Sequence, residues 1–362
     1  MKIAIDIRHL GAPHQAGVGK YTLKLISELA QLAPDDQFFL FASGRPQTLA
    51  YLPKFTAPNI TVIEKNIPNR LLFLLFLLKI KTIESLLPEQ PDIWLFPNHN
   101  IIHTKIPYAL TVHDISFDIF PAFFTLKDRL RYKLGRAKEF TQKAKHIFAV
   151  SESTRRDLID RWNIDPSKVT ATPLGVDSKY NGKELPSDSS YLSLHKIRGE
   201  YLLCLCTREP RKNLEAVIEA YASCDNLPNL VIAGGRGWKS KTLDEVIKKS
   251  GVKHRIQVIG YVPEKHKPAL YRHAKAFLFP SFYEGFGLPA AEAIACGTPV
   301  IASSTGSLPE IVSKNAILVD PFNVTDLVQA LKMVNEKKTQ DKPEHSWSDT
   351  AKRTYEILKN LS

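Results

Sequence analysis

Residues 276–300 read AFLFPSFYEGFGLPAAEAIACGTPV, and this stretch sets the fold expected for the whole chain. Its first four residues are an apolar run typical of a buried strand, which Pro280 ends. A loop with two glycines follows. From Leu288 the pattern becomes helical, because Pro289 suits a first helical turn and Gly297 suits the position just past a helix end. The apolar residues after Gly297 predict the next buried strand.

A strand, a glycine loop and a helix N-terminus in this order form a natural anion site. The first N–H groups of the helix lack partners within it, and the helix dipole favours negative charge there. Gly285 and Gly287 let the backbone approach a phosphate closely. We expect Glu284 in the loop beside the ligand, and Glu292 on the helix, where it can accept hydrogen bonds from ribose hydroxyls. The stretch therefore predicts binding of a nucleotide diphosphate with its sugar.

The E-x7-E spacing from Glu284 to Glu292 resembles the signature of retaining glycosyltransferases of family 4, and so do the flanks FPS and CGTPV. The resemblance implies an α/β GT-B fold, in which two Rossmann-like doubly wound domains face each other across a cleft. It also implies a set of residues that contact a nucleotide-sugar donor, namely Glu284, Gly285, Phe286, Gly287, Leu288 and Glu292.

Composition agrees with a two-domain globular protein, since 362 residues suggest about two domains. The formal net charge of +12 favours anionic partners such as a nucleotide diphosphate or a phospholipid surface, and no motif supports nucleic acid. The four cysteines show no metal-ligand spacing and suit buried thiols in a reducing compartment. We expect no metal site and no cofactor other than the donor substrate, linked to GDP or UDP.

Two features bear on membranes. Met1 to Asp6 predicts a strand and not a signal peptide, and the longest apolar run, Leu71 to Leu78, is far shorter than the ~20 residues that span a bilayer. We therefore expect a cytoplasmic protein that is either soluble or in peripheral contact with the inner face of the membrane. The apolar run lies in an expected helix, Asn69 to Leu87, that is either buried in the core or covered by lipid or a second subunit.

Another expected helix, Thr125 to Lys145, carries an apolar stripe flanked by cations, with only Asp128 and Glu139 as acidic residues. This pattern suits an anionic membrane surface or a phosphorylated acceptor, and the alternative is a solvated basic face. The stripe consists of Leu126, Leu130, Leu134, Ala137 and Thr141, and the basic residues are Lys127, Arg129, Arg131, Lys133, Arg136, Lys138, Lys143 and Lys145.

In the first domain, expected at residues 1–180, two further groups are candidates. Gly17 and Gly19 lie in a loop before an expected helix, and the sequence around them does not fit a Walker motif. The family resemblance implies that this loop approaches the donor phosphates and the acceptor; the alternative is a plain turn. His113 follows the strand Tyr108 to Val112, and strand ends face the ligand crevice in open α/β sheets. The resemblance implies that His113 contacts the transferred sugar.

The second, nucleotide-sugar-binding domain is expected at residues 195–340, after a hinge at Pro173 to Asp177 and a polar linker at Asn181 to Ser193. A final helix, 346–361, is expected to cross back onto the first, acceptor-side domain, as in GT-B folds.

The loop from Thr207 to Asn213 places cations between a strand and a helix, which suits phosphate. By resemblance Lys212 is the lysine of the donor-phosphate site, and the second cation is Arg208 or Arg211. The alternative is a surface turn. The nucleobase is expected against Tyr261 and Val262.

The function expected is a retaining hexosyl transfer from a nucleotide-sugar donor to a glycan or lipid-linked acceptor, with His113, Lys212 and Glu284 as the catalytic residues. The variants Pro-Arg-Lys-Asn and Gly-Arg-Gly-Trp resemble those of mannosyltransferases that use GDP-mannose, in polysaccharide or lipopolysaccharide biosynthesis. Two alternatives remain. Gly285 to Ala290 also fits the G-x-G-x-x-A pattern of an NAD-dependent oxidoreductase, although no carboxylate follows the next strand. The other is a non-catalytic nucleotide-binding protein of similar fold.

Overall fold

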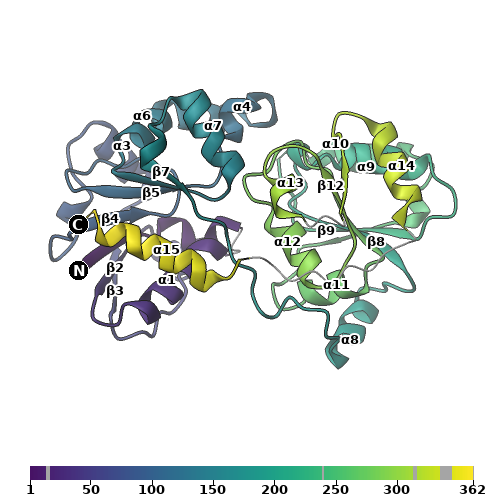
Figure 1. Ribbon diagram of the computed structural model, residues 1–362, viewed down its shortest axis with the longest axis horizontal. Helices are drawn as coiled ribbons and strands as arrows, with labels where there is room; N and C mark the ends of the chain where they lie inside the picture. The colour runs from purple at the N-terminus through teal and green to yellow at the C-terminus, as the bar shows by residue number, and fades with distance from the viewer. Residues whose placement is uncertain (14–16, 239, 313–315, 335–344, 362) are drawn as a thin grey trace. The chain divides into compact units, whose positions relative to one another are not determined.

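The computed structural model describes residues 1–13, 17–238, 240–312, 316–334 and 345–361. Within them the chain forms two compact units, each built on one sheet (Figure 1). The first unit comprises Met1–Phe117, Leu126–Gly175 and His345–Ser362, and the second comprises Asp118–Thr125 and Val176–Glu344. All strand pairings in both sheets are parallel, which confirms the expected doubly wound α/β fold.

The first sheet has the strand order β3-β2-β1-β4-β5-β6-β7, so the order reverses between β1 and β4. Apart from the edge strand β3, which is largely exposed, its strands are mostly apolar and buried, as expected for a parallel sheet covered on both faces. They are β1 (Lys2–Asp6), β2 (Gln37–Ser43), β3 (Ile60–Lys65), β4 (Ile93–Phe96), β5 (Tyr108–Val112), β6 (His146–Ala149) and β7 (Val169–Ala171).

Helices alternate with these strands, and short 3-10 turns lie at Arg8–Leu10, Glu84–Leu86, Pro121–Phe123 and Pro166–Lys168. The helices are α1 (Gly17–Leu32), α2 (Pro46–Leu49), α3 (Asn69–Leu77), α4 (Ser116–Ile119), α5 (Leu126–Leu134), α6 (Ala137–Lys143), α7 (Glu152–Trp162) and α15 (Trp347–Lys359). Because α1 begins at Gly17, both Gly17 and Gly19 lie in its first turn and not in the preceding loop.

The second sheet has the order β10-β9-β8-β11-β12-β13, with 3-10 turns at Pro210–Lys212 and Lys253–Arg255. Its strands are β8 (Tyr201–Leu205), β9 (Asn229–Ala233), β10 (Ile256–Gly260), β11 (Ala276–Phe279), β12 (Val300–Ser303) and β13 (Ile317–Val319). Its helices are α8 (Pro186–Leu194), α9 (Leu214–Ala222), α10 (Ser240–Lys249), α11 (Lys267–His273), α12 (Leu288–Ala295), α13 (Leu308–Ile311) and α14 (Val324–Lys332).

The C-terminal helix α15 belongs to the first unit (Figure 1). Its Thr350 hydroxyl donates to the Pro173 carbonyl at 2.7 Å, and Tyr355 donates to Asp36 at 2.8 Å. Gly175 is required where α15 begins, because a Cβ there would lie 2.1 Å from the Trp347 nitrogen. The boundary between the two units falls directly after Gly175, inside the segment expected to be the hinge.

Three expected elements were wrong in detail. The polar linker contains helix α8, which Pro186 starts and whose Asp188 carboxylate accepts from the Leu185 N–H at 3.2 Å; burial of Tyr191 and Leu192 supplies the packing. The helix expected from Asn69 ends at Leu77. The helix expected from Thr125 to Lys145 breaks into α5 and α6, because Arg136 adopts a left-handed conformation with φ 48°.

Candidate functional site

The turn Pro210–Lys212 positions two cations after strand β8. Pro210 starts this 3-10 turn, and Asn213 ends it in a left-handed conformation with φ 55°, which asparagine tolerates. The Asn213 side chain donates to the Pro321 carbonyl at 2.8 Å and so fixes the turn to the chain that follows β13. Arg211 and Lys212 are thereby held side by side at the carboxyl end of the sheet, where ligands bind in open α/β folds.

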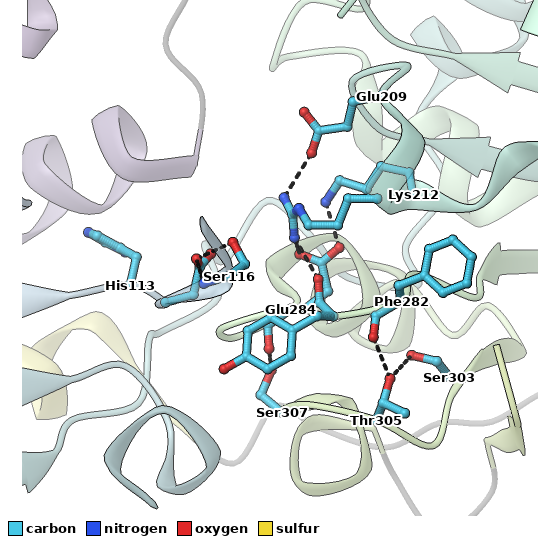
Figure 2. Close-up of polar contacts among 12 residues, drawn as sticks. His113, Ser116, Glu209, Lys212, Phe282, Glu284, Ser303, Thr305 and Ser307 are labelled. Carbon is cyan, nitrogen blue, oxygen red and sulfur yellow. Dashed lines mark hydrogen bonds and ion pairs between the residues drawn. The ribbon is translucent and has the colours of Figure 1, made fainter. Parts of the chain in front are cut away.

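Both cations meet Glu284, the first carboxylate of the E-x7-E pair. Lys212 Nζ lies 2.6 Å from Glu284 Oε1, and Arg211 Nη1 lies 3.0 Å from Glu284 Oε2 (Figure 2). Arg211 also donates to the Tyr283 carbonyl at 2.6 Å and to Glu209 Oε1 at 2.9 Å. The structure thus brings together Lys212, Arg211 and Glu284, and adds Glu209, which the sequence analysis did not select.

These four side chains form a buried network of alternating charge, with exposed fractions of 6% for Glu209, 14% for Arg211, 10% for Lys212 and 9% for Glu284. Burial alone would raise the pKa of Glu284, but the charges of Arg211 and Lys212 outweigh it and lower this pKa to about 2. Glu284 is therefore ionised at neutral pH and holds both cations in place.

The loop that carries Glu284 is clamped by the segment after β12. Thr305 donates to the Phe282 carbonyl at 2.9 Å, and the Ser307 hydroxyl donates to the Glu284 carbonyl at 3.0 Å (Figure 2). Gly306 has φ +61°, and a Cβ there would lie 2.8 Å from the Glu284 carbonyl oxygen. On the other side, the Phe282 N–H donates to the Arg211 carbonyl at 2.9 Å. The Glu284 carboxylate is therefore fixed from two directions.

Helix α12 starts where the sequence predicts. Gly287 precedes it with φ 93°, a backbone conformation that favours glycine, and a Cβ there would also push against the Leu308 side chain at 2.4 Å. Gly285, Phe286 and Leu288 are buried. Glu292 is buried on α12, 3% exposed, and accepts from the Tyr271 hydroxyl at 3.3 Å.

The remaining predicted donor-site residues differ in their surroundings. Arg208 is buried and faces Asp244 at 3.6 Å, and the structure does not bring it to Glu284. Tyr261, which follows β10, is 44% exposed, whereas Val262 is buried in the core, so that only its backbone could face a ligand.

In the first unit, His113 lies directly after β5. Its Nε2 donates to the Pro97 carbonyl at 2.8 Å, because a carbonyl can only accept, and its ring packs edge-on against Tyr21 at 4.9 Å. Burial lowers the pKa of His113, so the ring is neutral near pH 7 and its Nδ1 is a hydrogen-bond acceptor.

A polar cluster that the sequence analysis missed follows β1 and β4. Asp6 and Arg8 form a buried ion pair at 2.7 Å, and Asn100 donates to Asp6 at 3.2 Å. His9 and His99 bond to threonine hydroxyls at 2.8 Å, and burial lowers the pKa of each to about 4. The strand-end rule applied to His113 would also have selected these residues.

The described residues show neither a metal site nor a membrane-spanning helix. They contain no group of three or more His, Cys, Asp or Glu side chains that could hold a metal ion. Within the same part of the chain, no helix is both long and apolar enough to cross a bilayer. Strand β12 ends at Ser303, followed by Ser304 and Thr305, so the carboxylate that a dinucleotide-binding site needs does not follow it.

Comparison with known proteins agrees with the geometry. The family models "Glycosyltransferase Family 4" and "Glycosyl transferases group 1" match residues 16–180 and 194–354. O-antigen chain mannosyltransferase B of Escherichia coli is 30% identical over 326 residues, which cover 85% of this chain and 84% of that protein.

Sucrose-phosphate synthase from Thermosynechococcus elongatus has a similar structure, with a TM-score of 0.77 and 19% identity. The match covers 99% of this chain and 98% of that chain. Anabaena HepE in complex with UDP-glucose gives a TM-score of 0.73 at 19% identity over 100% of both chains. These likenesses confirm the GT-B fold expected from the sequence.

Proposed function

Because this chain belongs to glycosyltransferase family 4, we propose that it transfers a mannosyl residue, with retention of configuration, from a nucleotide-linked donor to a growing glycan. Family membership decides against the oxidoreductase and the non-catalytic binding protein. The mannosyl group is favoured by the E. coli relative, a mannosyltransferase, and GDP-mannose is the donor that we expect. The observation that carries the proposal is the pairing of Lys212 and Arg211 on Glu284.

In this proposal the two cations stabilise the leaving nucleoside diphosphate. Departure of the nucleotide leaves negative charge on the β-phosphate, which Lys212, Arg211 and the N-terminus of α12 are arranged to offset. Arg211 is favoured over Arg208 as the second cation, because Arg208 already faces Asp244. Glu284 orients the donor sugar through its hydroxyls. In the first unit, neutral His113 offers its Nδ1 as a hydrogen-bond acceptor for a sugar hydroxyl, since its Nε2 is engaged by the Pro97 carbonyl.

The proposed acceptor is a lipid-linked glycan at the inner face of the membrane. It is motivated by the E. coli relative, which acts on O-antigen chains by its name, and by the basic segment 125–145. Leu126 and Leu130 of that segment are 79% and 56% exposed, so the first part of the apolar stripe faces outward, whereas Ala137 and Thr141 are buried. An outward stripe with flanking cations suits an anionic surface.

The test is a binding screen followed by a transfer assay. Isothermal titration with GDP, UDP and ADP should give at least one binder, and GDP-mannose should be consumed with release of an α-linked product detectable by NMR. Binding of none of the three nucleotides would overturn the donor site. Transfer from UDP-glucose, as found bound to HepE, in place of GDP-mannose would keep the enzyme class and correct the donor.

Transfer is expected to be independent of divalent metal. The cations of Lys212 and Arg211 already supply positive charge beside the proposed diphosphate position. The rate in excess EDTA should match the rate without it. A complete loss in EDTA that Mg²⁺ or Mn²⁺ reverses would contradict this prediction.

A further inference from the structure

The first unit contains a cavity of about 590 Å³ that the proposed reaction does not use. Its volume lies within the range of about 300–1,000 Å³ typical of small-molecule sites. It opens at the amino end of β5, where Tyr108 lines it, between the C-terminal ends of α3 and α5 and one side of α6. Figure 1 shows α3 and α6 next to each other in this unit.

The cavity lies at the opposite end of β5 from His113. Tyr108 begins the strand and His113 follows its last residue, so about 16 Å of extended chain separates them. The cavity is therefore distinct from the strand ends where we expect the sugars to bind.

The floor of the cavity is apolar and well packed. Phe140 stacks on Tyr108 with ring centroids 4.6 Å apart, and the Tyr108 hydroxyl donates to the Phe140 carbonyl at 2.6 Å. Gly135 lies at the break between α5 and α6, and a Cβ there would approach Ile101 to 2.9 Å. The helix break that the sequence analysis did not predict thus forms one wall.

The rim carries a strong excess of positive charge. Among the described residues that line the cavity, five are lysine or arginine and only Glu139 is acidic: Lys79, Lys105, Arg136, Lys143 and Lys145. Glu139 pairs with Arg136 at 3.2 Å. Within the described chain, the ammonium groups of Lys79, Lys105, Lys143 and Lys145 make no ion pair, so four unmatched cations remain at the rim.

Two exposed apolar stripes end at this cavity. Leu74 on α3 and Leu78 at its C-cap are 48% and 58% exposed, although the neighbouring Leu72 and Phe76 are buried. On α5, Leu130 and Leu134 are 56% and 42% exposed, and Leu134 lines the cavity itself. Of the two alternatives for this apolar run, complete burial in the core is therefore excluded, and the exposed face is left for a partner.

We propose that the cavity binds the phosphate headgroup of an anionic phospholipid, while the leucines of α3 and α5 enter the apolar part of the same leaflet. The unmatched cations fit the phosphate, and the leucines fit the acyl chains beside it. The proposal extends the membrane contact of the proposed function to a defined site, and it does not depend on which sugar is transferred. A second copy of the chain fits less well, because a two-fold interface would place this basic rim against itself.

The test is co-sedimentation of the full-length protein with phosphatidylcholine vesicles, with and without phosphatidylglycerol. Wild type should pellet only with the anionic vesicles. A triple variant of the rim, Lys79→Glu, Lys143→Glu and Lys145→Glu, should bind them at least tenfold more weakly. The matched control, Lys54→Glu, Lys168→Glu and Lys352→Glu, makes the same change in net charge at exposed lysines of the same unit and should stay within about threefold of wild type.

A second readout follows the leucines. The native cysteines are buried, so Leu130→Cys can be labelled selectively with an environment-sensitive fluorophore. The emission of the fluorophore should shift to the blue with anionic vesicles and not with inorganic phosphate alone.

Equal losses of vesicle binding in the rim and control variants, or a wild type that does not bind anionic vesicles, would overturn the site. So would a dimer in light scattering that Leu74→Ser and Leu130→Ser convert to a monomer. GDP titration of the rim variant separates these outcomes from failure of the donor site, which lies in the other unit.

Discussion

Replacing Lys212 by alanine is expected to weaken nucleoside diphosphate binding by about 1.5–3 kcal/mol, the contribution of a hydrogen bond to a charged group. It should also lower kcat by about 10²–10³-fold, as when one preorganised group that stabilises the leaving charge is lost. In wild type the two positive and two negative charges of the network cancel. Without Lys212, the two carboxylates outnumber the single cation, Arg211. The site then repels the diphosphate that it should attract.

The matched control is Lys275→Ala. Lys275 precedes β11, at the opposite end of that strand from the Glu284 loop, and pairs with Glu200 at 2.8 Å. It should leave both GDP affinity and kcat within about twofold, because a partly exposed ion pair contributes little. Calorimetry and a donor-consumption assay measure the two effects. If Lys212→Ala binds GDP as wild type does, Lys212 does not contact the phosphates.

The fold could be predicted because strand and turn signals in this chain are local. The apolar run Ala276–Phe279, the glycine at 287 and the proline at 289 each fix backbone structure within a few residues, and α12 begins where they indicate. Helix α8 was missed because its composition is polar and its stability comes from distant contacts: Arg272 holds Asp188 at 2.8 Å. Tertiary partners of this kind leave no periodic pattern in the sequence.

The candidate site was likewise predictable only where local sequence spacing sets the structure. Spacing selected Glu284 and Lys212, but it could not decide between Arg208 and Arg211, because their partners come from distant parts of the chain. Arg211 pairs with Glu284, whereas Arg208 faces Asp244. The clamp by Thr305 and Ser307 joins loops that follow different strands, and the lysine-rimmed cavity depends on where α5 breaks. Both the clamp and the cavity join segments that are distant in the sequence, so they form only once the sheet and its helices have packed, and the sequence alone does not show them.

Replacing Glu284 by glutamine should have the opposite effect on nucleotide binding from Lys212→Ala. Glutamine is close in shape but neutral, so Arg211 and Lys212 are left with only Glu209 as a counter-charge. We expect GDP to bind at least as tightly as to wild type. Transfer should nevertheless fall by about 10²-fold or more, because the donor sugar and both cations lose the carboxylate that orients them. Glu200→Gln, which changes an exposed carboxylate of the same unit, should alter neither quantity by more than about twofold.

The same substitution should change how stability depends on pH. The pKa of Glu284 is lowered from 4.5 to about 2 in the folded chain, which corresponds to about 3 kcal/mol in favour of the ionised form. This stabilisation is fully present above pH 4.5 and is lost as the pH falls through 2. Urea unfolding should therefore show Glu284→Gln less stable than wild type at neutral pH, with a smaller difference at about pH 3.5. A constant difference across this range, or GDP binding weakened as much as in Lys212→Ala, would show that Glu284 does not act as the buried counter-ion of the two cations.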